Sequence, residues 1–268
     1  MSFTALTDGQ IDMQFTGSYF VEPPFIYGMR IIFSMTTSRR LPLCERTIKS
    51  LRCHVHDLDR VNEILHLDDG SSADDLLRMR DLFAEAFPRS KLRSFAESRF
   101  PNLAHHACMM QKWHDLASPA DYVFHCEDDW EFVEGGNLIS DAIVVMNANP
   151  AIGQVGLWRK PPQENIRVMG EVSYWVWRHD PSQGFVHRLQ HEDDIDPAWP
   201  HFSLRPSIIR CEALRRSGNF QVQRFFEHAY AVHWTELGWN TAFLARKHCV
   251  HQAPGPAQSV YALAGTLR

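Results

Sequence analysis

The sequence predicts an α/β protein built on a mostly parallel central sheet flanked by helices. Three observations lead to this prediction. Short apolar, β-branched segments alternate with segments of helical periodicity from residue 30 onward. Within each strand-like segment the apolar residues form an almost unbroken run, as in parallel strands that are buried on both faces. No internal repeat or low-complexity tract interrupts the alternation.

Length and composition favour one soluble domain that acts on a small ligand. The chain has 268 residues, 44% hydrophobic and 22% charged, which are ordinary values for a protein with a sizeable core. Its net charge of -5 gives no general attraction to nucleic acid or anionic membranes. We find no signal peptide, no apolar run long enough for a transmembrane segment, and six cysteines without C-x-x-C spacing. We expect a cytoplasmic protein without a nucleic-acid partner, and leave a homodimer open.

The first half of the chain shows the alternation most clearly. Residues 30–37 form the first predicted strand, and a helix begins near Pro42, a favourable residue for a first turn. A second strand covers residues 63–67. The helix after it is capped by Ser72 and ends before Pro88.

The later elements follow the same order, with one long interruption. In chain order we expect a helix at 103–117, a strand at 122–126, a helix at 136–147, a strand at 152–158, helices at 211–217 and 227–237, and a strand at 242–251. Residues 159–206 are rich in Trp, Pro, His and Asp, which predicts long loops that build a binding surface. We divide the chain into an extension at 1–29, a single main domain at 30–253 and a tail at 254–268.

Three adjacent carboxylates, Glu127-Asp128-Asp129, follow the strand predicted at 122–126. Neighbouring carboxylates repel one another, and at the end of an apolar strand they are costly without a cation or strong donors. A hard divalent ion such as Mn2+ or Mg2+ is their natural partner. Taken alone, such a triplet is more often a solvated acidic turn. Its sequence context therefore decides between a solvated turn and a metal site.

That context is two more polar turns after apolar strands. Thr36-Thr37-Ser38 follows the first strand, and Asp68-Asp69-Gly70-Ser71 follows the second. In a parallel sheet, the carboxyl ends of such strands lie at one edge. We therefore expect the three turns to converge on one ligand.

The order of the T-T-S, D-D-G-S and E-D-D turns resembles the nucleotide-binding half of GT-A glycosyltransferases, especially the large inverting family typified by bacterial polysaccharide synthases. The resemblance covers the donor half, residues 30–135, well and the acceptor half, residues 136–253, loosely. It implies a GT-A fold and transfer of a sugar from a nucleoside diphosphate, with a UDP-sugar favoured. The implied acceptor is a hydroxyl of a glycan, a lipid-linked sugar or a protein.

The resemblance also implies roles for particular residues. Contacts to the nucleotide sugar fall on the residues of the three turns: Thr36, Thr37 or Ser38, Asp69, Glu127 and Asp128. Within this set, Asp128 takes the place that faces the ribose. Asp129, the last residue of the acidic triplet, takes the place that binds the metal. Glu127 stands where the family's D-x-D element begins with Asp, a variant also seen in related sugar transferases.

Two matches in the C-terminal half complete the predicted site. Inverting members use a carboxylate at the start of a late helix as general base, and Glu227 resembles that residue, with Glu236 as second choice. The alternative is that Glu227 only complements the positive end of its helix. His251 resembles the C-terminal histidine that joins the metal or the diphosphate, with His248 as the alternative.

Aromatic and basic residues offer weaker signals. Four tryptophans can stack on an acceptor sugar, although core packing explains at least half of such residues: Trp158, Trp175, Trp177 and Trp199. Four basic residues can add phosphate contacts, although exposed arginines and lysines are usually just solvated: Arg39, Arg40, Arg159 and Lys160.

Two other classes of protein fit part of this pattern. A nucleotidyltransferase that makes nucleotide sugars combines the same kind of sheet with an acidic metal site, but it normally needs a glycine-rich loop after the first strand. The segment from Thr36 to Pro42 contains no glycine. A non-catalytic carbohydrate- or nucleotide-binding module on the same fold is the other alternative.

Overall fold

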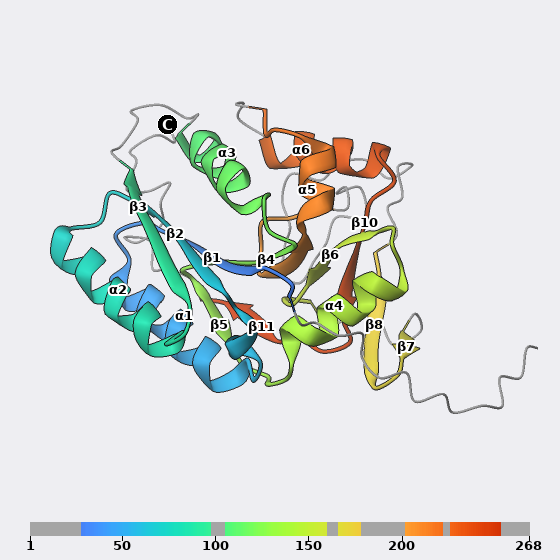
Figure 1. Cartoon of the computed structure of the whole chain (residues 1–268), viewed down its shortest axis with the longest axis horizontal. Coiled ribbons are helices and arrows are strands. Elements are labelled where there is room, and N and C mark those ends of the chain that lie inside the picture. The colour runs from blue at the N-terminus through green and yellow to red at the C-terminus, as the bar shows by residue number, and fades with distance from the viewer. Residues whose placement is uncertain (1–27, 98–104, 160–165, 178–201, 222–225, 253–268) are drawn as a thin grey trace, which may run out of the picture.

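A nine-stranded sheet forms the centre of the computed structural model (Figure 1). The structure describes residues 28–97, 105–159, 166–177, 202–221 and 226–252. The strands of the large sheet are β1 (Ile31–Thr37), β2 (Glu63–Asp69), β3 (Lys91–Glu97), β4 (Tyr122–Glu127), β6 (Ile152–Gly156), β7 (Arg167–Met169), β8 (Val172–Val176), β9 (Ser207–Arg210) and β10 (Asn240–Leu244). Almost all of the predicted extension at 1–29, and the whole tail at 254–268, lie outside the described residues.

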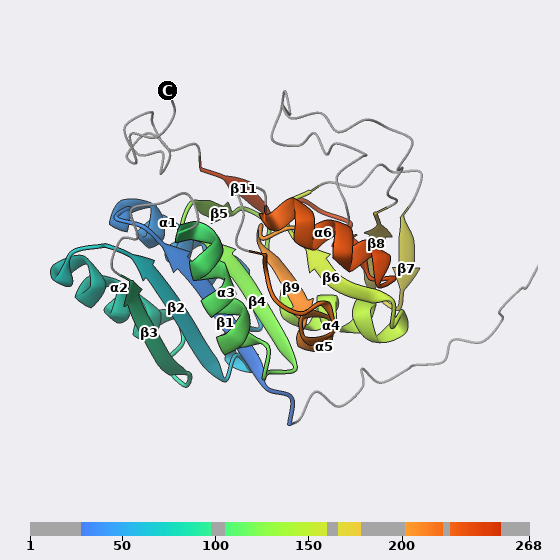
Figure 2. The ribbon, with the colours of Figure 1, turned by 90° about the horizontal axis from the view of Figure 1, so that it is seen from above.

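The sheet is mostly parallel, as the sequence predicted. Its order is β3-β2-β1-β4-β9-β6-β10-β8-β7, and Figure 2 shows the part from β3 through β2, β1 and β4 to β9. Strands β3, β2, β1 and β4 are parallel neighbours, and so are β6 and β10. Strands β9 and β8 each run antiparallel to both of their neighbours.

Helices cover both faces of the sheet (Figure 1). Helices α1 (Leu41–His54), α2 (Ala73–Ala86) and α4 (Leu138–Ala148) lie on one face, and α3 (His105–Ala117), α5 (Cys211–Ser217) and α6 (Phe226–Glu236) lie on the other. Successive side chains of a strand point to opposite faces. Phe33 of β1 therefore packs in the core under α1 and α2, while its neighbour Ile32 packs in the core under α3.

The first two helices begin where the sequence predicted, because local residues favour a helix start there. Pro42 lies in the first turn of α1, where its missing N–H costs nothing. Ser72 caps α2, because its hydroxyl accepts a hydrogen bond from Asp75 N at 3.1 Å. Among the helices that the structure describes, none is both long and apolar enough to span a bilayer.

Several strands were not predicted from the sequence. Strand β3 mixes charged and apolar residues and lies at the sheet edge, so it lacks the apolar run of a central strand. Part of the segment expected to be loops, residues 159–206, forms β7 and β8. The single strand expected at 242–251 is divided between β10 and β11 (Cys249–His251), and β11 pairs with β5 (Trp130–Phe132) in a separate two-stranded sheet. These pairings depend on partners far away in the sequence, which a local pattern does not show.

Candidate functional site

The three polar turns lie at the same edge of the sheet, as expected. The parallel register pairs Thr37 of β1 with Asp68 of β2, and Thr36 of β1 with Glu127 of β4. The carboxyl ends of β1, β2 and β4 are therefore level. Ligands of open α/β sheets bind at such an edge.

Asp68 closes the turn after β2 and is fully buried. Its carboxylate accepts hydrogen bonds from Thr37 Oγ1 at 2.7 Å, Ser71 N at 2.7 Å and Ser71 Oγ at 2.6 Å. Thr37 is buried as well, so its hydroxyl holds the Asp68 carboxylate in place and is not exposed to a ligand. Thr36, Ser38 and Asp69 are partly exposed at the edge of the sheet. Of the predicted nucleotide contacts in the first two turns, these three are the accessible ones.

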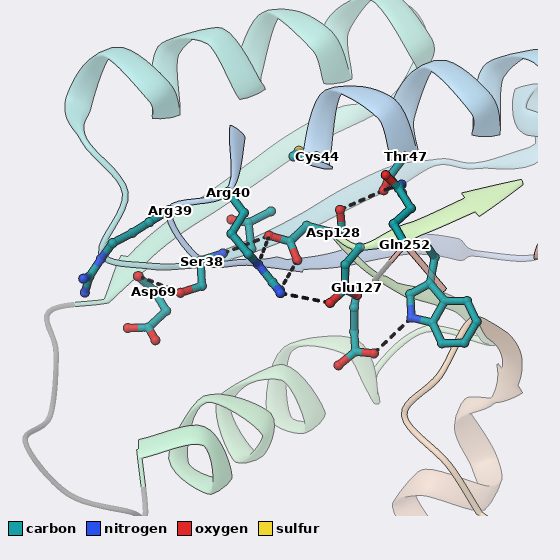
Figure 3. Close-up of polar contacts among 12 residues, drawn as sticks. Ser38, Arg39, Arg40, Cys44, Thr47, Asp69, Glu127, Asp128 and Gln252 are labelled. Atoms are coloured by element: carbon teal, nitrogen blue, oxygen red, sulfur yellow. Dashed lines mark hydrogen bonds and ion pairs between the residues drawn. The ribbon is translucent and has the colours of Figure 1, made fainter. Parts of the chain in front are cut away.

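Asp128 is buried, and Figure 3 shows Arg40 in contact with its carboxylate. Its side chain is 0% exposed and forms a two-pronged ion pair with Arg40: Nε lies 3.3 Å from Oδ2, and Nη2 contacts Oδ1. The backbone N of Ser38 donates to Oδ2 at 3.1 Å, and Thr47 Oγ1 donates to the Asp128 carbonyl at 2.8 Å. Burial raises the pKa of Asp128, and Arg40 opposes that rise. Asp128 thus fixes the loop between β1 and α1 against β4, and its predicted contact to the ribose stays a prediction.

Asp129 brings together groups from both halves of the chain. Its Oδ2 lies 2.9 Å from Arg40 Nη1 and 3.3 Å from His251 Nε2. Burial raises the pKa of Asp129, but the contacts to His251 and Arg40 outweigh burial and hold it below its usual value. The other oxygen, Oδ1, is buried and finds no hydrogen-bond partner within the described part of the chain.

The small sheet of β5 and β11 explains why His251 reaches Asp129. The antiparallel register pairs His251 with Trp130, the residue after Asp129. Gln252 N then donates to the Asp129 carbonyl at 2.7 Å. The alternative histidine, His248, is buried, with Nδ1 3.1 Å from the Glu134 carbonyl oxygen. Of the two candidates, His251 is the one in contact with the acidic turn.

The charge of Glu227, in the first turn of α6, reaches Glu127. Burial raises the pKa of Glu127, and the charges of Asp129 and Glu227 raise it further. The hydrogen bond from Trp130 Nε1 to Glu127 Oε2, at 3.2 Å, opposes that rise. The start of α6 therefore lies near the acidic turn.

Glu227 is partly exposed in the first turn of α6. Its Oε1 accepts hydrogen bonds from Leu204 N at 2.9 Å and Ser203 Oγ at 3.1 Å, so it also ties the segment before β9 to α6. The second-choice base, Glu236, lies about 13 Å further along the helix at 1.5 Å per residue. Its side chain is 68% exposed and pairs with His233 at 3.5 Å. The geometry favours Glu227 over Glu236.

The three described tryptophans of the predicted acceptor side are buried. Trp158 and Trp175 pack on Phe243, with ring centroids 5.2 and 5.5 Å away, and Trp177 packs on Trp175. Core packing accounts for these three rings. The fourth, Trp199, lies outside the described residues.

The chemistry of Asp129 and His251 fits a divalent ion. Mg2+ and Mn2+ are bound by one or two protein ligands together with phosphate oxygens and water. The buried Oδ1 of Asp129 lacks a partner that such an ion would provide. No group of three or more His, Cys, Asp or Glu side chains that could hold a metal is found in the described ranges. The protein alone would thus give an open site, completed by ligand oxygens.

Arg40, Thr47 and Gln252 shape the site but were not in the predicted set. Gln252 Nε2 lies 3.3 Å from Thr47 Oγ1, which itself holds the Asp128 carbonyl. Arg40 was considered as a phosphate contact and set aside as a residue of an exposed turn; it is instead only 10% exposed. The sequence did contain a signal for the role of Arg40, because this residue directly precedes a predicted helix at the same sheet edge as the three carboxylates.

Comparison with known proteins shows the fold class. No protein-family model and no curated sequence matches the chain. A mannosyltransferase from Pyrobaculum calidifontis in complex with GDP-Man and Mn2+ has a TM-score of 0.59 at 18% identity, over 92% of this chain and 63% of that one. GalNAc-T7 with UDP, GalNAc and Mn2+ has a TM-score of 0.54 at 13% identity, over 84% and 44%. UTP-bound UGPase from Acinetobacter baumannii has a TM-score of 0.51 at 10% identity, over 88% and 93%.

The chain therefore has the GT-A fold of nucleotide-sugar glycosyltransferases, as the three turns predicted. It spans less than two thirds of the length of that mannosyltransferase and of GalNAc-T7. At these identities the likeness concerns the fold. Activity must be argued from the site itself.

Proposed function

We propose that the protein is a divalent-metal-dependent, inverting glycosyltransferase. Its donor would be a nucleoside-diphosphate sugar, with a UDP-sugar favoured, and its acceptor a hydroxyl of a glycan, a lipid-linked sugar or a protein. The contact between Asp129 and His251 carries the proposal. Both residues were expected to bind the metal on sequence grounds, and they come from opposite halves of the chain.

The accessible residues of the first two turns support the donor side. Thr36, Ser38 and Asp69 are partly exposed beside the acidic turn. In this proposal they contact the nucleobase, while Thr37 and Asp68 keep their turn in shape. Asp129 and His251 hold the divalent ion.

The chemical step would use Glu227 as general base. Its carboxylate takes the proton of the acceptor hydroxyl as that oxygen attacks the anomeric carbon. The bond between the anomeric carbon and the diphosphate oxygen breaks, and the nucleoside diphosphate leaves with the bonding electrons. Attack on the face opposite the leaving group inverts the anomeric centre. A bound divalent ion supplies positive charge that offsets the charge developing on the diphosphate.

A nucleotidyltransferase is the second candidate, because the matched UGPase is covered over 93% of its length. The loop between β1 and α1 counts against it. That loop has no glycine, and Ser38 and Arg40 tie it to Asp128. Formation of a nucleotide sugar from a sugar 1-phosphate and UTP would support this candidate.

Thermal-shift measurements with nucleoside diphosphates, with and without Mn2+, test the donor site. A ligand at 100 times its Kd stabilises a protein by about 2.7 kcal/mol. We expect stabilisation by one base, UDP first, only when Mn2+ is present. Equal shifts for all nucleotides, or none, would contradict the proposal. Sugar transfer or donor hydrolysis that is lost in Glu227→Gln would distinguish an enzyme from a binding module.

A further inference from the structure

Two arginines follow β1 in succession, and their side chains take opposite directions (Figure 3). Arg39 extends to the turn after β2, where its Nε donates to the Gly70 carbonyl at 3.0 Å. Arg40 extends to the acidic turn after β4, where it contacts Asp128 and Asp129. Arg40 is therefore the arginine of this loop that neutralises the carboxylates of the site.

The two contacts of Arg40 are unequal. Its pair with Asp128 is two-pronged, and the Asp128 side chain is 0% exposed. Its contact with Asp129 is a single N–H bond of 2.9 Å between side chains that are each 10% exposed. Two-pronged arginine–carboxylate pairs are stronger and geometrically more specific than single bonds. The contact with Asp129 is thus the one that can open while Asp128 keeps the guanidinium in place.

A divalent cation and the guanidinium would compete for Asp129. The carboxylate has a buried Oδ1 that lacks a partner in the described part of the molecule, and its Oδ2 is already shared by Arg40 and His251. Two cations close to one carboxylate repel each other strongly in a buried site. Displaced from Asp129, Arg40 would still lie beside it, with donor hydrogens in need of an anion.

We propose that Arg40 is a diphosphate-binding residue whose guanidinium is held by Asp129 until a divalent cation takes that carboxylate. Arg40 stays paired with Asp128 and exchanges Asp129 for a diphosphate oxygen of the donor. The identity of that anion rests on the function proposed above. The exchange makes binding of the cation and the diphosphate cooperative, because the cation frees the arginine that the diphosphate needs.

Binding of Mn2+ alone, followed by electron paramagnetic resonance, tests the competition. Arg40→Met removes the charge and keeps much of the side-chain length. We expect this variant to bind Mn2+ roughly tenfold more tightly than the wild type, because a competing cation next to the carboxylate is gone. Arg39→Met is the matched control, and we expect it to leave Mn2+ affinity unchanged. Equal or weaker Mn2+ binding by Arg40→Met would overturn the inference.

Titration calorimetry of UDP at saturating Mn2+ tests the diphosphate contact. Loss of a charged hydrogen bond should weaken UDP binding by Arg40→Met about tenfold or more. Uridine, which carries no phosphate, should bind the variant and the wild type alike. Unchanged UDP affinity, or an equal loss for uridine, would contradict a role in diphosphate binding.

Arg40→Lys keeps the experiment decisive if the methionine variant does not fold. Lysine retains the charge but lacks the two-pronged geometry, so we expect Mn2+ to bind about as in the wild type and UDP to bind several-fold more weakly. Failure of wild-type protein to bind UDP with Mn2+ would count against the proposed function. If wild-type UDP binding requires Mn2+ but the arginine variants match it in both titrations, the proposed function stands and this inference alone fails.

Discussion

The ion pair between Arg40 and Asp128 is expected to contribute strongly to stability, and Asp128→Asn tests this. The substitution preserves shape but removes the charge that pairs with a guanidinium only 10% exposed. Removing one partner of a buried pair typically costs about 3–5 kcal/mol. We expect about 3 kcal/mol, because Arg40 keeps its bond to Asp129. For a domain of this size, that is a fall in Tm of about 6–12 °C.

The exposed pair of Arg46 and Glu131 provides a matched control. Arg46 Nη2 lies 2.8 Å from Glu131 Oε2, an ordinary ion-pair distance, but the two side chains are 59% and 38% exposed. Exposed pairs contribute about 0–1 kcal/mol. Urea unfolding of Glu131→Gln should therefore show a loss below about 1 kcal/mol.

Double-mutant cycles separate the pair from its surroundings. One cycle combines Asp128→Asn with Arg40→Met, and the other combines Glu131→Gln with Arg46→Met. The coupling energy should exceed about 2 kcal/mol for the buried pair and stay below about 0.5 kcal/mol for the exposed one. Similar coupling energies in the two cycles would refute the reasoning that burial makes the first pair important.

Three further predictions concern catalysis, packing and pH. Glu227→Gln should lower kcat by about 100-fold or more while nucleotide affinity changes little, and Glu236→Gln should leave kcat unchanged; the reverse pattern would move the base to Glu236. Gly153→Ala places a Cβ against the Trp234 ring and should cost about 1–3 kcal/mol in urea unfolding, a loss that Trp234→Leu should reduce. Burial lowers the pKa of His125 to about 3, so below about pH 6.5 the unfolded chain binds a proton that the folded protein does not, and stability falls by about 1.4 kcal/mol per pH unit. Between pH 6 and 5, the stability of the wild type should fall more steeply than that of His125→Gln, by about that slope. Parallel stability curves would contradict the lowered pKa of His125.

Local patterns were enough to predict three strands of the donor half of the sheet, although they missed the edge strand β3. Strands β1, β2 and β4 are apolar runs that end in polar turns, and parallel strands bring such ends to one edge. The pattern failed where pairing is decided by distant partners. Strand β9 lies between β4 and β6 and runs against both, although it comes late in the chain.

The candidate site was predictable in residue type more than in arrangement. The carboxylates of the acidic turn were identified because adjacent charges after an apolar strand need a partner. Their accessibility was not: Asp128 is sealed and Asp129 is nearly so. Burial depends on which loop packs over the turn, and that is a property of the tertiary structure.

The sequence by itself determined that three polar turns meet at one edge of a parallel sheet, because the apolar strands and the polar residues that end them are local features, and parallel strands bring such ends to one edge. Only the tertiary structure decided which of two adjacent arginines enters the site. Arg39 adopts a left-handed backbone conformation, with φ at 49°, and extends to Gly70. The next residue, Arg40, therefore faces Asp128 and Asp129. Two residues of the same type and charge differ in role because the backbone turns between them.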